Sequence, residues 1–543
     1  MIGYTCKYTP VELLKAFGAE AKLLNTEAGN FDYAQSVTHM NMCSHMKAFL
    51  ENVHNSGIKE LIMVNCCDSV RRAYDVLKDE MDFIFIMDLP HNDNSCARDH
   101  LRDELLRLAD EYGRYSGETF DYELFAKAFV PEQSIPREKY IALLGARVGD
   151  GLYQTVQDMV PLPVADLTCS SNRAVHMPPA DEGFLQFMDA YAANLLGQIP
   201  CMRMADVAGR RELTEDPYLA GIIYHTVKFC DYYGFEYESL RRKTTVPMVK
   251  IETDFTMQSL GQLSTRVGGL VESMGIREEK AMTGNGKYFV GIDSGSTTTN
   301  VAVLDEAGNL VDSAIVRTGA KASKGAEKAF QALRVAKDDI AVIIATGYGR
   351  NNIDFADDSV TEITCHARGA FHLDSRVRTI IDIGGQDSKA ISLDDTGKVK
   401  NFAMNDKCAA GTGRFLENMA KVLEMDLDGI SKVGASWNED ITISSMCTVF
   451  AESEVVSLIA DNRQIPDIVH GLNKSVASKT MALVNRVGGE SRYMMTGGGA
   501  RNEGVVGCIE DLIGEKVIVP EIPDLCGAIG AALFASDAAC RKE

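Results

Sequence analysis

Short apolar runs alternate with helical patterns over the first half of the chain. Segments 9–24 and 96–113 have apolar side chains at the spacing of amphipathic helices. This alternation predicts α/β architecture with open, largely parallel sheets. We expect two Rossmann- or flavodoxin-like subdomains, at about 1–138 and 139–283. The apolar runs, each ending in turn residues and typical of buried strands, lie at 61–65, 83–88, 140–145 and 221–229.

A different pattern begins after a charged and then glycine-rich segment at 276–287, which has no apolar period and predicts a domain boundary. Residues 291–311 form a predicted strand, a turn rich in glycine and hydroxyl side chains, and a second strand. Asp293 ends the first strand. Similar glycine turns follow strands at 380–394, which contains Asp382, and at 494–505. Such turns offer backbone N–H groups to phosphates, so residues 288–543 are expected to bind phosphate groups.

Composition excludes several classes of protein. The 543 residues carry a formal net charge of -22, which argues against binding to nucleic acid or to an anionic membrane surface. No apolar run approaches the roughly 20 residues of a membrane-spanning helix, and the first residues lack the pattern of a signal peptide. We therefore expect a cytoplasmic protein. In that reducing compartment its 14 cysteines are expected to be thiols or metal ligands rather than disulfides.

Two cysteines of the second half stand before predicted helices: Cys408 in NDKCAAGTGRF and Cys447 in SMCTVFAESE. A 4Fe-4S cubane takes four thiolates, so two per chain predict a cluster shared across a dimer axis. The positive ends of the helix dipoles would stabilise its negative charge.

The cysteines of the first half follow a second pattern. Cys66 and Cys67 end one apolar run and precede an aspartate, and Cys230 ends another run in the same way. Cys43 begins a predicted helix. Because open α/β sheets bind ligands at the carboxyl ends of their strands, these thiols are expected to meet in a cleft between the subdomains.

Residues 288–536 resemble the activator ATPase of 2-hydroxyglutaryl-CoA dehydratase and the ATPase subunits of benzoyl-CoA reductase. The segments GIDSGSTTTN, ATGYGR, EITCHARGA, DIGGQDSKAI, NDKCAAGTGRFLE, CTVFAESEVVSLIA and TGGGARN carry the resemblance. It implies the two-lobed, ribonuclease-H-like fold of the acetate kinase, sugar kinase, Hsp70 and actin superfamily, ATP or ADP with Mg2+, and a homodimer bridged by a 4Fe-4S cluster on Cys408 and Cys447. Asp293, Asp382 and Gln386 would be catalytic. The implied nucleotide-binding residues are Gly295, Ser296, Thr297, Thr298, Gly347, Gly384, Gly385, Gly497, Gly498, Gly499, Arg501 and Asn502.

Residues 3–275 resemble the D-component of 2-hydroxyacyl-CoA dehydratases, through segments such as NMCSHMKAFLE, NCCDSVRRAYDVLKDEMDFIFIMDLPH and FCDYYGFEYESLRR. The resemblance implies that Cys43, Cys67 or its neighbour Cys66, and Cys230 ligate a cluster. This half is shorter than a full dehydratase subunit, which leaves acyl-CoA binding open. Three further cysteines, Cys6, Cys169 and Cys201, are either ordinary buried thiols or complete the six ligands of an 8Fe-9S double cubane, as in the double-cubane cluster proteins.

Together these patterns predict an ATP-dependent iron–sulfur reductase. It would receive electrons from a donor such as ferredoxin or flavodoxin and reduce a small molecule. One alternative is a component or activator of a 2-hydroxyacyl-CoA dehydratase or acyl-CoA reductase. The other is a non-enzymatic, ATP-driven switch that recognises another iron–sulfur protein and whose own first-half cysteines are structural.

Overall fold

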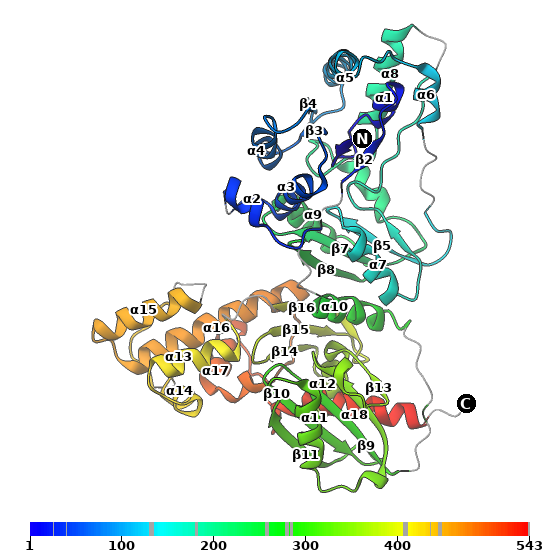
Figure 1. Ribbon diagram of the computed structural model, residues 1–543. Helices are drawn as coiled ribbons and strands as arrows, with labels where there is room; N and C mark the ends of the chain where they lie inside the picture. Colours follow the sequence, from blue (N-terminus) through cyan, green and yellow to red (C-terminus); the bar gives the residue numbers. More distant parts are fainter. Residues whose placement is uncertain are drawn as a thin grey trace. The chain divides into compact units, whose positions relative to one another are not determined.

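The computed structural model divides the chain into two compact units, Met1–Val267 and Gly268–Glu543, which are described separately (Figure 1). The residues that the structure describes are 1–24, 27–39, 41–129, 135–179, 183–255, 260–276, 282, 286–405, 411–434, 436–443 and 448–540. In this described part no helix is both long and apolar enough to cross a membrane.

The first unit begins with a parallel sheet of order β2-β1-β3-β4, formed by Ala21–Leu23, Ile2–Tyr4, Glu60–Asn65 and Phe83–Asp88. Alternate residues of β3 enter different cores, as the period of a strand requires. Ile62 and Val64 pack with α1 (Val11–Ala16) and α5 (Ser95–Ser116). Leu61 and Met63 pack with α3 (Ser44–Ser56) and α4 (Asp68–Leu77). Helices therefore cover both faces of this sheet, as its continuous apolar runs require.

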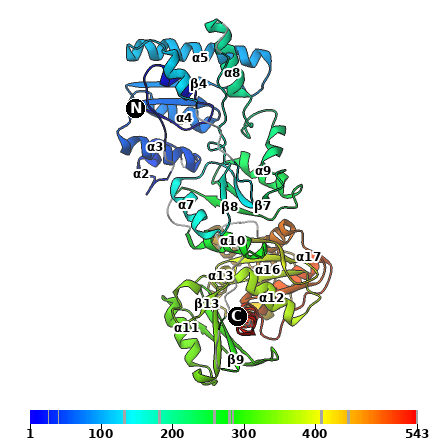
Figure 2. The same ribbon diagram turned by 90° about the vertical axis from the view of Figure 1, so that its right-hand side faces the viewer.

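A second parallel sheet has the order β6-β5-β7-β8, from Val164–Asp166, Tyr140–Gly145, Leu219–Val227 and Met248–Thr253. Helix α8 (Phe184–Leu196) comes between its strands in sequence but packs beside α5 in the core of the first sheet, and the two helices lie together in both Figure 1 and Figure 2. The two sheets are thus tied together by this returning helix. The other described helices of this unit are α2 (Asp32–Val37), α6 (Tyr122–Lys127), α7 (Asp150–Met159), the 3-10 helix η1 (Ala208–Leu213) and α9 (Asp231–Arg241). Helix α10 (Leu260–Ser273) contains the boundary between the two units.

One expected element is wrong. The helical pattern over 9–24 ends early, because α1 stops at Ala16 and Gly18 takes the left-handed conformation with φ of +73°. The rest of that segment forms β2, which pairs with β1. Glycine adopts positive φ without steric cost, so it ends the helix although the apolar spacing continues.

The second unit contains two sheets of the same strand order. One is β11-β10-β9-β12-β13, and the other is β16-β15-β14-β17. In each, the first three strands in sequence are antiparallel neighbours and the fourth pairs in parallel with the first. This confirms the predicted hairpin at 291–311 and the two-lobed fold. The strands are β9 (Tyr288–Ser294), β10 (Thr298–Leu304), β11 (Leu310–Arg317), β12 (Ile340–Thr346), β13 (Asp358–Ser359), β14 (Thr379–Ile383), β15 (Ser388–Leu393), β16 (Val399–Asn405) and β17 (Tyr493–Thr496).

Two helices of this unit, α12 (Glu362–Leu373) and α18 (Cys526–Cys540), cross at glycines. A Cβ on Gly530 would lie 1.8 Å from the carbonyl oxygen of Cys365, and one on Gly369 would lie 2.1 Å from that of Cys526. The two backbones are therefore in direct contact. The other helices are α11 (Ala322–Gln331), η3 (Lys337–Asp339), η4 (Arg350–Asn352), α13 (Gly413–Val422), α14 (Leu427–Val433), α15 (Thr448–Ala460), α16 (Ile465–Val487), η5 (Gly498–Arg501), α17 (Glu503–Ile513) and η6 (Pro523–Leu525).

The crossing predicts how two similar substitutions differ. Gly530→Ala should destabilise the second unit by about 3 kcal/mol or more, because the added methyl group meets backbone that cannot move aside. Gly507→Ala in α17 is the matched control, since a Cβ there has nothing within 4 Å. The control should stabilise the helix by about 0.5–1 kcal/mol. Denaturant unfolding of the two variants checks this, and equal stability of both would contradict the described crossing.

Candidate functional site

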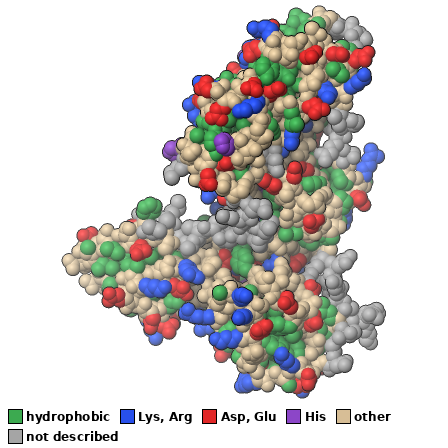
Figure 3. All heavy atoms as spheres, viewed as in Figure 1, with side chains coloured by type: hydrophobic (Ala, Val, Ile, Leu, Met, Phe, Trp, Pro, Cys, Tyr) green, Lys and Arg blue, Asp and Glu red, His purple; other side chains and the backbone are tan. Residues whose placement is uncertain are grey.

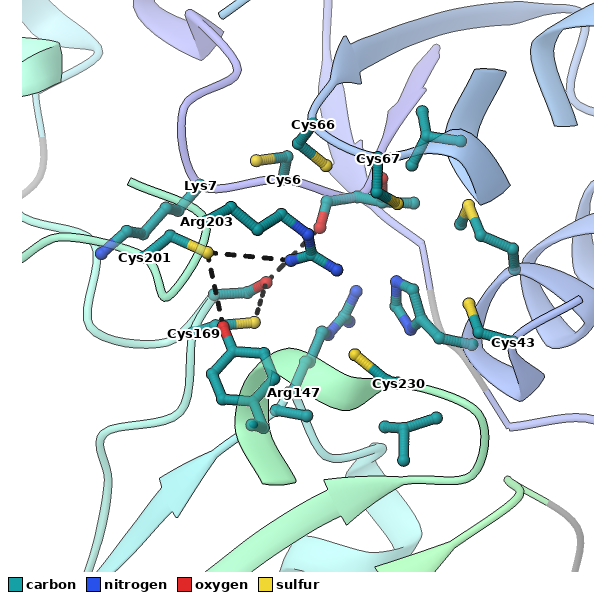
Figure 4. Close-up of a pocket in the computed structure, with 18 of the residues that line it drawn as sticks. Cys6, Lys7, Cys43, Cys66, Cys67, Arg147, Cys169, Cys201, Arg203 and Cys230 are labelled. Atoms are coloured by element: carbon teal, nitrogen blue, oxygen red, sulfur yellow. Dashed lines mark hydrogen bonds between the residues drawn. The ribbon is translucent and has the colours of Figure 1, made fainter. Parts of the chain in front are cut away.

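Seven cysteine side chains of the first unit line one cavity between its two sheets (Figure 4). All seven are free thiols. The structure therefore brings together every thiol that the sequence singled out in this half, including those for which ordinary burial was the alternative. They are Cys6, Cys43, Cys66, Cys67, Cys169, Cys201 and Cys230.

The direction of the strands explains this convergence. Cys6 follows β1, the pair Cys66 and Cys67 follows β3, Cys169 follows β6 and Cys230 follows β7. The strands of each sheet are parallel, so their carboxyl ends lie at one edge, and the two edges meet at the cavity. Cys201 is different, because it lies in the irregular segment between α8 and η1.

Three of the thiols stand at helix starts. Cys43, Cys67 and Cys230 are the N-cap residues of α3, α4 and α9, and none of these side chains makes a capping hydrogen bond. The positive end of each helix dipole therefore faces a sulfur atom. This environment favours a thiolate or another negative group at the same place.

The electrostatic effects of the thiols on one another divide them into two groups. Burial raises the pKa of Cys230 to about 11, and the neighbouring thiols of Cys43 and Cys67 raise it further. Burial raises the pKa of Cys6 to about 12, and Cys201 and Cys169 add to that shift. We call Cys43, Cys67 and Cys230 the helix-cap group, and Cys6, Cys169 and Cys201 the loop group.

Cys66 lies beside both groups. A hydrogen bond between its side chain and that of Cys67 lowers the pKa of Cys67 to about 5 and, with burial, raises the pKa of Cys66. Of these two neighbouring thiols, Cys67 is therefore the one that ionises first. In the loop group the pKa of Cys201 falls in spite of burial, because Arg203 and the hydroxyl of Tyr233 stabilise its thiolate.

Cationic side chains line the same cavity, and the sequence reasoning missed them. They are Lys7, Arg147 and Arg203. Arg203 Nη1 donates to Cys201 Sγ at 3.7 Å, and that sulfur lies 3.5 Å from the hydroxyl of Tyr233. The only signal in the sequence was proximity, since Arg203 follows Cys201 by two residues.

The donor set fits an iron–sulfur cluster better than a single metal ion. Within the described residues, no three His, Cys, Asp or Glu side chains are close enough to hold one ion. A cubane has different requirements, because each thiolate binds a separate iron atom and the ligands stand around the cluster. Two groups of three thiols, with helix N-termini and cations between them, suit such an anionic group.

The second unit has a cleft of about 280 Å³ between its two lobes. Asp293 and Asp382 line it, but Gln386 is exposed, and neither Gln386 nor Gly347 lines the cleft in the described structure. Gly347 instead packs on Asp293, where a Cβ would lie 2.6 Å from Oδ1. The predicted nucleotide-binding residues that do line the cleft are Gly295, Ser296, Thr297, Thr298, Gly384, Gly385, Gly497, Gly498, Gly499, Arg501 and Asn502.

The two aspartates occupy equivalent positions in the two lobes. Asp293 pairs with Thr346 across β9 and β12, and Asp382 pairs with Thr496 across β14 and β17. His366 of α12 lies between them, with Nε2 at 3.8 Å from Asp293 and Nδ1 at 3.7 Å from Asp382. Burial, reinforced by nearby carboxylates, raises the pKa of Asp293 to about 7. A divalent cation at this place would offset that cost.

Lys389 is a cleft residue that the sequence reasoning missed. Its Nζ lies 2.5 Å from Asp387, 3.2 Å from Asp382 and 3.6 Å from Glu362. Burial alone would lower the pKa of Lys389, but these carboxylates raise it well above its usual range. Lys389 and His366 both lie in segments quoted for the family resemblance, DIGGQDSKAI and EITCHARGA, although spacing gave no reason to select them.

Some buried polar atoms of the cleft have no hydrogen-bond partner in the structure. Thr297 Oγ1 and Asn300 Oδ1, which belong to residues that line the cleft, are buried without a hydrogen bond in the structure. Buried polar groups are normally satisfied, so these atoms fit a site for phosphate oxygens or for the water shell of a magnesium ion.

Cys408 and Cys447 lie outside the described residues. The described helix α15 begins at Thr448, the residue after Cys447, and exposes Phe450 to 67%, Val456 to 53% and Ile459 to 38%. Apolar side chains are visible over this helix in Figure 3. An exposed apolar helix of this kind is typical of an interaction surface.

Comparison with known proteins follows the division into two halves. Residues 290–535 match the BadF/BadG/BcrA/BcrD ATPase family, and residues 6–137 and 134–274 match the D-component of 2-hydroxyglutaryl-CoA dehydratase. The 2-hydroxyisocaproyl-CoA dehydratase activator of Clostridioides difficile is 45% identical over 255 residues, which is 46% of this chain and 96% of that protein. The (R)-2-hydroxyglutaryl-CoA dehydratase activating ATPase of Acidaminococcus fermentans is 43% identical over 46% of this chain and 96% of its own length.

Among solved structures, the activator of the 2-hydroxyisocaproyl-CoA dehydratase from Clostridium difficile with bound ADPNP is 44% identical. The alignment covers 46% of this chain and 95% of that one, with a TM-score of 0.45. The matches confirm both resemblances found in the sequence. The chain therefore belongs to the BadF/BadG/BcrA/BcrD ATPase family, joined in one polypeptide to a half that matches the D-component of 2-hydroxyglutaryl-CoA dehydratase.

Proposed function

We propose that this protein hydrolyses ATP to deliver low-potential electrons, one at a time, to an iron–sulfur cofactor held in the cavity of its first unit. The electrons would come from a 4Fe-4S cluster held by Cys408 and Cys447 of two chains. Bound in these places, such clusters supply one-electron reduction at low potential. The single observation that carries the proposal is the convergence of seven thiols on one cavity.

The grouping of the thiols favours a double cubane. The helix-cap group and the loop group each offer three thiolates, which together are the six ligands of an 8Fe-9S cofactor. Cys66 would then be a neighbour rather than a ligand, because Cys67, and not Cys66, is the N-cap residue of α4. Within the helix-cap group, α3, α4 and α9 would direct their N-termini at the cofactor and stabilise its negative charge.

The residues of the cleft would bind the nucleotide. Asp293 and Asp382 would orient Mg2+ and its water ligands, and Thr297 would donate to a phosphate. His366 contacts both aspartates and would keep them in register as the lobes close on ATP. Raising one electron by about 200 mV costs about 4.6 kcal/mol from ΔG = -nFΔE, which nucleotide turnover can supply.

We propose that two chains pair through their ATPase units. The exposed apolar side chains of α15 directly follow Cys447 in the sequence, so pairing there would bury them near the shared cluster. A ferredoxin or flavodoxin of the cytoplasm would reload the cluster, and the final acceptor would be a small molecule.

A second candidate is a component or activator of a 2-hydroxyacyl-CoA dehydratase or acyl-CoA reductase. The names of the relatives favour it, since they are dehydratase activators and, in Thauera aromatica, a component of benzoyl-CoA reductase. In that case the cavity would hold a single cubane on the helix-cap group. The third possibility, a switch without its own cofactor in the first unit, would leave the cavity thiols unligated.

Iron content separates these functions. Anaerobic iron and sulfide analysis of the full chain should give roughly twenty iron atoms per dimer, which is four bridging and eight per cavity. Roughly twelve would support the dehydratase-type single cubane, and roughly four the switch. Cys201→Ser should lower the iron content because it removes a ligand of the loop group. Cys96→Ser, which changes an exposed cysteine outside the cavity, should leave it unchanged.

The bridging cluster should require both Cys408 and Cys447 from each chain. Cys408→Ser should abolish the bridging 4Fe-4S signal in electron paramagnetic resonance while nucleotide binding, measured by calorimetry, persists. The reason is that the dimer would retain only two of four thiolates. A bridging signal of parental intensity in this variant would refute the assignment.

ATP hydrolysis in the cleft should depend on Asp293. Asp293→Asn should reduce ATP hydrolysis by orders of magnitude without unfolding the chain, because a neutral amide binds the Mg2+ shell weakly. Asp338→Asn, at an exposed position of the same unit, should hydrolyse ATP at the parental rate. Phosphate release and circular dichroism measure the two properties, and full activity of the Asp293 variant would rule out this site.

A further inference from the structure

Arg203 occupies the centre of the thiol cavity. Figure 4 shows its side chain reaching from the side of Cys201 into the space enclosed by the other labelled cysteines. Its positive charge acts on thiols of both groups. It favours the thiolates of Cys201 in the loop group and of Cys67 and Cys230 in the helix-cap group.

The charge of Arg203 has no carboxylate partner. In the described part of the chain, no Asp or Glu lies within ion-pair distance of its guanidinium. Its contacts are the sulfur of Cys201 and the ring of Tyr232, whose centroid lies 5.1 Å from Cζ. Its Nε is buried and has no hydrogen-bond acceptor.

Other arginines of the first unit show what is normal in this fold. Arg173 forms a bidentate pair with Glu12, and Arg210 forms one with Glu236. A charge removed from water is costly unless it is paired. Arg203 instead faces sulfur atoms, so the negative charge that pairs with it must be carried by the thiolates or by a group that they hold.

The other two cations of the cavity are engaged elsewhere. Lys7 Nζ donates to Asn172 Oδ1 at 2.9 Å and to the carbonyl oxygen of Ile199, and Arg147 Nη1 donates to the carbonyl oxygen of Leu24 at 2.6 Å. Among the described residues Arg203 is thus the cavity cation that donates to one of the cavity thiols, and its Nε has no acceptor.

We propose that Arg203 donates hydrogen bonds to sulfur atoms of the cavity cofactor and raises its reduction potential. This inference rests on the proposed function, which places an iron–sulfur cofactor in the cavity. Each reduction adds one electron and one negative charge, and no proton is required. A fixed positive charge stabilises the reduced state more than the oxidised state. Arg203 would therefore set how readily the cofactor accepts an electron from the ATPase half.

The test is a potentiometric titration of the full chain with dithionite as reductant, followed by electron paramagnetic resonance. Arg203→Met removes the charge and the donors, and Arg203→Lys keeps the charge but loses the fork of N–H groups. Arg211→Gln removes the same charge from an exposed position in the following 3-10 helix η1 and is the matched control. The bridging cluster provides an internal reference in every sample.

We expect the Met variant to bind iron as the parent does and to shift the ratio of reduced to oxidised cofactor at least tenfold towards oxidised. That shift is a fall of about 59 mV for a one-electron couple. The Lys variant should shift less in the same direction, and the Arg211 variant and the bridging cluster should not shift.

Two results would overturn the inference. One is an unchanged cavity potential in an Arg203→Met protein with full iron. The other is loss of cavity iron in both Arg203 variants, which would make Arg203 an assembly residue instead. Failure of the proposed function itself is recognised separately, because the parent protein would then contain no cavity iron before any variant is measured.

Discussion

The direction of the parallel strands is the constraint on which the first unit depends. Parallel strands place all their carboxyl ends at one edge, and each strand must then turn into the segment that follows it. In both sheets a cysteine stands at such a turn, and α8 returns to the first sheet and holds the two edges together. Residues more than two hundred positions apart, such as Cys6 and Cys230, therefore line the same cavity. The thiol site follows from this topology.

The second unit positions its two aspartates by repeating one arrangement of strands. The first four strands of each lobe have the same order, and the penultimate residue of each first strand is an aspartate that pairs with a threonine of the neighbouring strand. A glycine with positive φ follows that threonine in both lobes, at Gly347 and Gly497. A side chain on either glycine would collide with the aspartate of its lobe. The cleft is therefore built from two copies of one local arrangement, and His366 contacts the aspartate of each copy.

Much of the fold and of the two candidate sites could be predicted because short segments of the sequence indicate them. Strand-end cysteines such as Cys66 and Cys230, and glycine turns after apolar strands, can be read from a few consecutive residues. Residues selected by distant partners could not be found in this way. Arg203 lies in an irregular segment, and Lys389 is defined by carboxylates from other elements. The early end of α1 was missed because apolar spacing continued past Gly18 and concealed a change from helix to strand.

The three cysteines at helix starts have a consequence for how the first unit is assembled. A serine, threonine or aspartate at an N-cap closes the first turn with its own oxygen and contributes about 1 kcal/mol to the helix. Cysteine is a weak acceptor, and Cys43, Cys67 and Cys230 leave this bond unmade. The first turns of α3, α4 and α9 therefore gain less stabilisation from their caps than an oxygen-bearing side chain would give. A negative group bound in the cavity would stabilise all three first turns at once, so binding of that group and rigidification of the cavity rim would become one cooperative event.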